Sequence, residues 1–203
     1  MRAMTRIRTL AAAFALAVTA GPALAEQLSL DAISDYLDGL GTARSEFTQI
    51  NADETISTGT ITIKRPGRVR FEYNPPEETL VLASAGQLAV FDAKSNTGPE
   101  QYPLSRTPLN LILARDVDLG RSGMVTGTSY DGTATTVTAQ DPEHPEYGNI
   151  QLTFTADPVE LRQWVITDDT GTQTTVVLGA LEKVSNVSDR NFSIVAEVEA
   201  RNR

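Results

Sequence analysis

The residues with the most evident capacity for acid–base or metal chemistry lie in one short loop. His144 is the only histidine of the chain, and it lies in the proline-flanked acidic loop 141–146. A catalytic histidine needs a nucleophile and an orienting carboxylate held in fixed geometry, and this loop provides no rigid element to hold them. His144 could also contact a cation together with Asp141, Glu143 and Glu146, but such a loop is equally compatible with simple solvation. The loop therefore predicts neither a hydrolytic triad nor a specific metal site.

The remaining acidic clusters are explained by turns and strands. Asp168 opens an Asp-Asp-Thr-Gly stretch that matches a hairpin turn better than a calcium loop, since the other calcium-binding positions are absent. Glu77 and Glu78 are adjacent, so in a strand they point to opposite faces and cannot share a proton. The chain has no cysteine, which excludes disulfides, thiol catalysis and thiolate-bound metal. We therefore expect no enzyme, no metal and no cofactor.

Arg65 indicates a different kind of chemistry. In the stretch 59–65, Ile61, Ile63 and Arg65 fall on one face of a strand because side chains alternate with period two. Arginine stays charged and carries five N–H donors, so at the rim of an apolar concavity it needs acceptors from a covering element. The alternative is that the strand ends at Lys64 and that Arg65 extends into water. The strand pattern alone leaves both interpretations open.

The N-terminus has the layout of a secretory signal peptide. Three arginines precede an apolar stretch at 10–20, and Ala23-Leu24-Ala25 is a small-x-small cleavage site. We predict cleavage before Glu26, leaving one domain at 26–203 that is exported as a soluble protein. Loss of the three leader arginines takes the net charge from −9 to −12. An acidic chain of this kind is not expected to bind nucleic acid.

The elements that must position these residues are mostly strands. A helix is predicted over 30–40, capped by Ser29, and a second over 108–114, with Thr107 as its cap. Phe192 and Ile194 indicate a last short strand, and 197–203 a frayed tail. The other strands are predicted from Phe47 and over residues 58–65, 67–73, 78–82, 87–92, 124–130, 133–140, 149–155, 161–167 and 172–178. A meander of short antiparallel strands curls, and the two helices are the only candidates to cover its apolar side.

Several stretches of the chain resemble the LolA family of periplasmic carriers of outer-membrane lipoproteins. The resemblance runs in order along the mature chain, through Phe47-Thr48-Gln49, the stretch from Gly59 to Tyr73 with its Lys64-Arg65-Pro66, then Pro76, the Thr107–Ala114 segment, Gly148–Phe154, and Leu161-Arg162-Gln163-Trp164 followed by Asp168. The resemblance implies a mainly β (α+β) fold: a half-open antiparallel barrel of about eleven strands, with short helices as a lid over an apolar cavity.

The resemblance also implies a function and residues that carry it. The protein would be a non-enzymatic, monomeric chaperone that shuttles lipoproteins through the periplasm from the inner to the outer membrane. An inner-membrane ABC transporter of the Lol type would load it, and a LolB-like acceptor would unload it. Arg65 would lock the lid through its backbone carbonyls, and Leu109, Ile112 and Leu113 would form the lid underside. The acyl chains would contact Ile61, Ile63, Val69, Phe71, Leu80, Leu82, Leu88, Val90, Ile150, Leu152 and Phe154.

Two other classes of protein remain open on the sequence. One is a periplasmic sensor or regulatory module that uses the same lipid-binding architecture to report its ligand to a membrane partner. The other is a hydrolase of exported substrates, which the single histidine disfavours.

Overall fold

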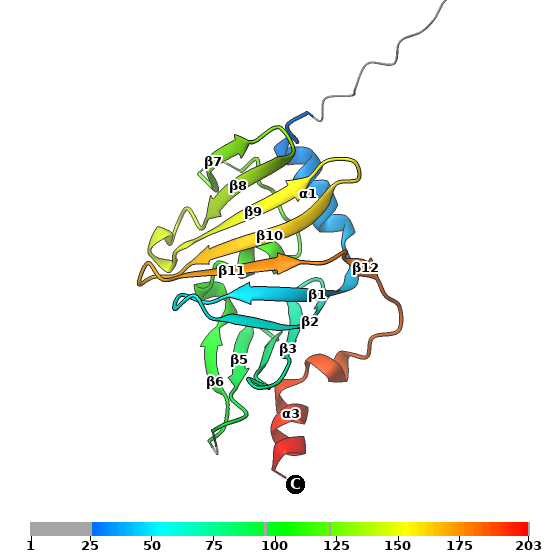
Figure 1. The fold of residues 1–203 in the computed structure, drawn as a ribbon, viewed down its shortest axis with the longest axis vertical. Helices are drawn as coiled ribbons and strands as arrows, with labels where there is room; N and C mark the ends of the chain where they lie inside the picture. The colour runs from blue at the N-terminus through cyan, green and yellow to red at the C-terminus, as the bar shows by residue number, and fades with distance from the viewer. Residues whose placement is uncertain (1–25, 96, 122, 203) are drawn as a thin grey trace, which may run out of the picture.

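The computed structural model describes residues 26–95, 97–121 and 123–202, and the predicted signal peptide lies outside them. Its main feature is one curved antiparallel sheet, with strands in the order β6-β5-β4-β3-β2-β1-β11-β10-β9-β8-β7 and a short β12 beside β1 (Figure 1). The strands are β1 (Thr42–Ile50), β2 (Ile56–Lys64), β3 (Arg68–Tyr73), β4 (Leu80–Ser84), β5 (Gln87–Phe91), β6 (Glu100–Pro103), β7 (Val125–Tyr130), β8 (Ala134–Gln140), β9 (Asn149–Thr155), β10 (Glu160–Thr167), β11 (Gln173–Leu178) and β12 (Glu182–Lys183).

The sheet is an incomplete barrel, as predicted. Strands β6 and β7 form its two ends and do not pair with each other, so the barrel stays open between them. The predicted number of about eleven strands agrees with the eleven of the continuous path, to which the two-residue β12 adds a twelfth.

Strict alternation along the strands gives the sheet an inner apolar face. In β9, Ile150, Leu152 and Phe154 are fully buried and the residues between them are half-buried. The register places Leu152 beside Trp164 of β10 and Val137 of β8, so apolar side chains form continuous rows across the strands. We call this face, which packs against α1 and α2, the inner face, and the opposite one the outer face.

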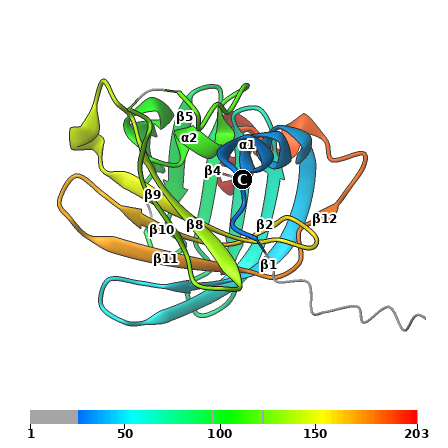
Figure 2. The same ribbon diagram turned by 90° about the horizontal axis from the view of Figure 1, so that it is seen from above.

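Two helical segments lie across the open side of the inner face (Figure 2). They are α1 (Leu30–Gly39) and the pair formed by the 3₁₀ turn η1 (Leu104–Arg106) and α2 (Asn110–Leu113). Ser29 caps α1 as predicted, since its hydroxyl oxygen accepts the backbone N–H of Ala32 at 3.1 Å. The predicted cap at Thr107 is wrong, because its hydroxyl instead donates to the carbonyl of Leu104 at 2.8 Å.

The C-terminus differs most from the sequence prediction. In place of a strand and a frayed tail, the chain forms the 3₁₀ turn η3 (Asp189–Phe192) and the helix α3 (Ile194–Arg201). Ser193 caps α3 by accepting the N–H of Ala196 at 3.1 Å, and Phe192 is fully buried. The short turn η2 (Pro145–Tyr147) completes the helical elements of the described residues. None of the helices among these residues has the length and apolar character needed to span a membrane.

Candidate functional site: an apolar interior beneath a helical lid

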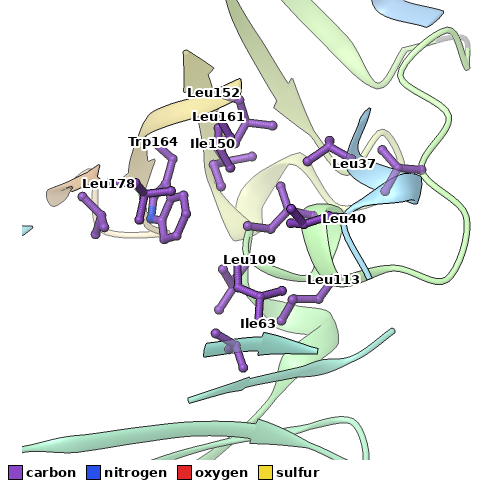
Figure 3. Packing of buried hydrophobic residues seen from close by; sticks show 14 of the residues in the cluster. Leu37, Leu40, Ile63, Leu109, Leu113, Ile150, Leu152, Leu161, Trp164 and Leu178 are labelled. Atoms are coloured by element: carbon purple, nitrogen blue, oxygen red, sulfur yellow. The ribbon is translucent and has the colours of Figure 1, made fainter. Parts of the chain in front are cut away.

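The inner face and the lid form one continuous apolar core. We define the lid as α1 together with residues 104–119. Figure 3 shows lid side chains such as Leu37 and Leu113 extending toward Ile63 of β2 and Ile150 of β9. Ten of the predicted ligand-contacting and lid residues are buried in this core, each at most 6% exposed: Ile61, Ile63, Val69, Phe71, Ile150, Leu152, Phe154, Leu109, Ile112 and Leu113.

Strand β4 requires a correction to the predicted cavity wall. Leu80 and Leu82 lie on the outer face, where they pack with Phe91 beneath Ile194 and Val198 of α3 in a second, separate core. The inner-face residues of β4 are Val81 and Ala83, which the prediction missed.

The cause of this error is that β4 is apolar on both faces. The run Leu80-Val81-Leu82-Ala83 is typical of a strand buried on both sides, for which alternation does not distinguish inward from outward. On β5 the predicted placement agrees with the structure. Leu88 packs against the inner core, and Val90 pairs with Val81 in the strand register.

The lid contributes more side chains to the core than the sequence indicated. Helix α1 and its C-cap residue place Ile33, Leu37 and Leu40 on the inner core, although the apolar stripe of the helix is equally typical of ordinary packing. On the other lid segment, further buried residues flank the predicted underside: Leu104, Val117 and Leu119. In this structure the lid side chains pack directly against the inner face, and we call this arrangement the closed lid.

Aromatic rings pack edge-to-face through the interior. Phe47 meets Phe71 and Tyr73 with ring centroids 5.5 and 5.1 Å apart, and Phe71 meets Trp164 at 6.3 Å.

Glycine is required at position 59, where a Cβ would lie 2.2 Å from the Glu72 carbonyl oxygen and 2.8 Å from the Phe47 ring. The Tyr73 hydroxyl donates to Gln49 at 2.7 Å, and burial raises the pKa of Tyr73 to about 12.

Arg65 lies where the lid meets the sheet. Strand β2 ends at Lys64, but the backbone N–H of Arg65 extends the pairing by donating to the Gly41 carbonyl at 2.9 Å. Its side chain is only 4% exposed, so it does not extend into water. The guanidinium donates to the carbonyl oxygens of Leu37 in α1 and Ala114 after α2, and to the Asp38 carboxylate at 2.9 Å.

These bonds reach carbonyls at the C-terminal ends of the two lid helices, and the Leu37 carbonyl accepts the Leu40 N–H at 3.2 Å as well. Carbonyls at the C-terminal end of a helix carry partial negative charge, so a fixed cation is stabilised beside them. Arg65 serves the C-terminal ends of both lid helices at once, because its planar fork presents several donors. Its Nε is buried and has no acceptor among the described residues. Burying this N–H without a partner costs free energy, which the other hydrogen bonds of the guanidinium offset.

Further polar bonds tie the lid segments together beside Arg65. The Asp38 carboxylate also accepts the Val117 N–H at 3.0 Å, and the Ser34 hydroxyl oxygen accepts the Leu119 N–H at 3.1 Å. The Gly67 N–H donates to the Leu113 carbonyl at 2.8 Å, which links the β2–β3 turn directly to α2. Arg65, Asp38 and Gly67 thus form a small polar cluster at one edge of an otherwise apolar contact between lid and sheet. We call this cluster the lock.

The loop with the single histidine borders the outside of the lid, where Asp141, Pro142 and Glu143 line a surface pocket with Asn110 and Val117. His144 is exposed, stacks on Tyr147 with centroids 4.7 Å apart, and has Nδ1 3.0 Å from a Glu146 oxygen. Among the described residues, no three acidic or histidine side chains come close enough together to hold a metal ion.

An open sheet curved around an apolar interior, with short helices bound across its open side, is the architecture of a half-open barrel with a helical cover. The chain belongs to the LolA family of outer-membrane lipoprotein carrier proteins, whose family model matches residues 38–195. This confirms the resemblance seen in the sequence. Proteins of this family are binding chaperones, not enzymes.

Individual relatives are distant in sequence. An outer-membrane lipoprotein carrier protein of Cupriavidus taiwanensis is 26% identical, with 83% of this chain and 84% of the relative covered. One of Azotobacter vinelandii is 24% identical, with 88% and 89% covered. A solved DUF1329 family protein from Desulfovibrio piger has the same fold, with a TM-score of 0.50 at 12% identity over 82% of this chain and 95% of that one.

Proposed function

We propose that this protein carries lipoproteins across the periplasm, with their acyl chains held between the inner face of the sheet and the lid. The observation that carries the proposal is the closure itself. A broad apolar surface is covered by short helices and locked by the Arg65 cluster at one edge. Such a cover exposes a large apolar site when the lock opens, and hides it again when the lock closes.

The free energy of packing the lid side chains and the free energy of burying an acyl chain in their place are of comparable size. Opening removes lid side chains such as Leu37, Ile112 and Leu113 from the core, at about 2 kcal/mol each. An acyl chain that takes their place contributes about 0.8 kcal/mol per buried methylene, so ten methylenes contribute roughly 8 kcal/mol. Loading and release can therefore be reversible, which a carrier needs and a storage protein does not.

The proposal includes the route of the cargo. The predicted signal peptide supports export and a periplasmic location, with the mature chain starting at Glu26. The names of the relatives support lipoproteins as the cargo. An inner-membrane ABC transporter of the Lol type as donor and a LolB-like protein as acceptor belong to the proposal through the family.

A competition experiment tests the ligand class. We expect lipid-free protein of residues 26–203 to bind an environment-sensitive fluorescent dye, and a triacylated lipopeptide to displace the dye. The same peptide without acyl chains should leave the dye bound, because the proposed site recognises hydrocarbon. If the dye does not bind, or if both peptides displace it equally, the proposed function is wrong.

A further inference from the structure

The β2–β3 turn that carries Arg65 also carries two cations on the opposite side of the sheet. Lys64 and Arg68 are directly paired in the register and point to the outer face, while Arg65 between them turns to the lid. Like charges placed opposite each other on adjacent strands repel and destabilise the pairing. An anion placed between these two cations therefore stabilises the turn.

Asp189 supplies that anion from the C-terminal segment. We call residues 184–202 the strap; this segment follows β12 and ends in α3, which packs over the outer face of β4 and β5 (Figure 1). One carboxylate oxygen of Asp189 accepts from Lys64 Nζ at 2.5 Å and from Arg68 Nη1 at 2.7 Å. The hydrogen bond from Lys64 and the charge of Arg68 lower the pKa of Asp189, so the carboxylate is ionised at neutral pH.

The strap is firmly attached on both sides of Asp189. Before it, the Val187 carbonyl accepts Lys64 Nζ at 2.8 Å. After it, Phe192 is fully buried and the Asn191 carbonyl accepts Arg70 Nη1 at 3.0 Å. Phe192 and the bond between Asn191 and Arg70 hold the strap on the sheet away from the turn, while the Asp189 side chain itself is 68% exposed.

We infer that Asp189 is a positioning residue for the lid lock: it holds the β2–β3 turn from the outer face at the place from which Arg65 reaches both lid helices on the inner face. The turn residues 65–67 make every contact of the lock that comes from the sheet, through the Arg65 guanidinium and the Gly67 N–H. Without the Asp189 carboxylate, Lys64 and Arg68 repel, the turn shifts, and the lock weakens. This inference rests on the proposed role of Arg65.

Amide hydrogen exchange tests the inference in the full mature chain. The Gly67 N–H donates to Leu113 and the Val117 N–H donates to Asp38, so both amides report the lock directly. In Asp189→Asn we expect both to exchange about three- to tenfold faster, with β8–β10 amides unchanged. Asp189→Glu should restore slow exchange, and 1 M salt should reduce the difference between Asp189→Asn and the unmodified protein.

Two further variants complete the design. Glu199→Gln removes the same charge from an exposed position of the strap whose side chain makes no hydrogen bond or ion pair among the described residues, and it should leave both amides unchanged. Arg65→Leu should accelerate both. If Arg65→Leu accelerates them and Asp189→Asn does not, the positioning role is wrong while the proposed function stands. If neither variant accelerates them, the lock itself is wrong, and this inference fails with it.

Discussion

Replacement of Arg65 by leucine is expected to produce a carrier that takes up acyl chains and releases them poorly. The closed lid loses the bonds to Leu37, Ala114 and Asp38, and hydrogen bonds to a charged donor contribute about 1.5–3 kcal/mol each. The loaded state loses none of these, because the lid is open, and gains roughly 1–2 kcal/mol from the new apolar side chain. Both effects favour the loaded state.

A transfer assay from loaded protein to acceptor membranes measures this effect. Even the loss of one such bond corresponds to about a tenfold shift in the equilibrium, so delivery should fall at least tenfold. Arg65→Lys should be intermediate, since lysine keeps the charge without the planar fork. Arg106→Leu is the matched control, because Arg106 is an exposed residue of the lid whose side chain makes no hydrogen bond or ion pair within the described part of the chain. Unimpaired delivery by Arg65→Leu would contradict the lock.

The second large effect concerns two leucines that are equally buried in different cores. Leu113 is 1% exposed beneath the lid, and Leu82 is fully buried on the outer face beneath α3. Truncation of either to alanine should remove about 2–5 kcal/mol of packing free energy. Only the Leu113 loss acts on lid closure, so Leu113→Ala should raise dye uptake by about thirtyfold or more.

The matched variant Leu82→Ala should leave dye uptake unchanged. It should lower the free energy of global unfolding by the full packing loss of about 2–5 kcal/mol. In Leu113→Ala the loss of global stability is limited to the free energy of lid opening, because the chain can unfold from the open form. Dye titration and urea denaturation of both variants provide the comparison. Equal dye uptake by the two variants would show that the lid does not open as a separate unit.

The sequence predicted those parts of the site in which one face of a strand is apolar and the other polar. In β2 and β9 the alternation identified Ile61, Ile63, Ile150 and Leu152 as inner-face residues, and the same pattern drew attention to Arg65. The acceptors of Arg65 could not be read from spacing. They are backbone carbonyls at Leu37 and Ala114, and every residue type has such a carbonyl.

The errors arise where a second layer covers the outer face. Nothing near Leu80 or Leu82 shows that a helix more than a hundred residues later in the chain packs over them. That helix was missed because α3 is short and only Ile194 and Val198 of its apolar residues pack on the outer core. Its cap at Ser193 was the available signal, since serine followed by Glu197 and small or apolar residues is compatible with a helix start.

The central claim is that acyl chains occupy the inner core in place of the lid side chains. A lipopeptide with a photoactivatable group near the end of an acyl chain, irradiated when bound and mapped by mass spectrometry, tests it most directly. The claim predicts adducts on inner-face strands β2, β3, β9 and β10 and on the lid underside at Leu109 and Leu113. Adducts concentrated on the outer core, at Leu82, Phe91 or Val198, would contradict it.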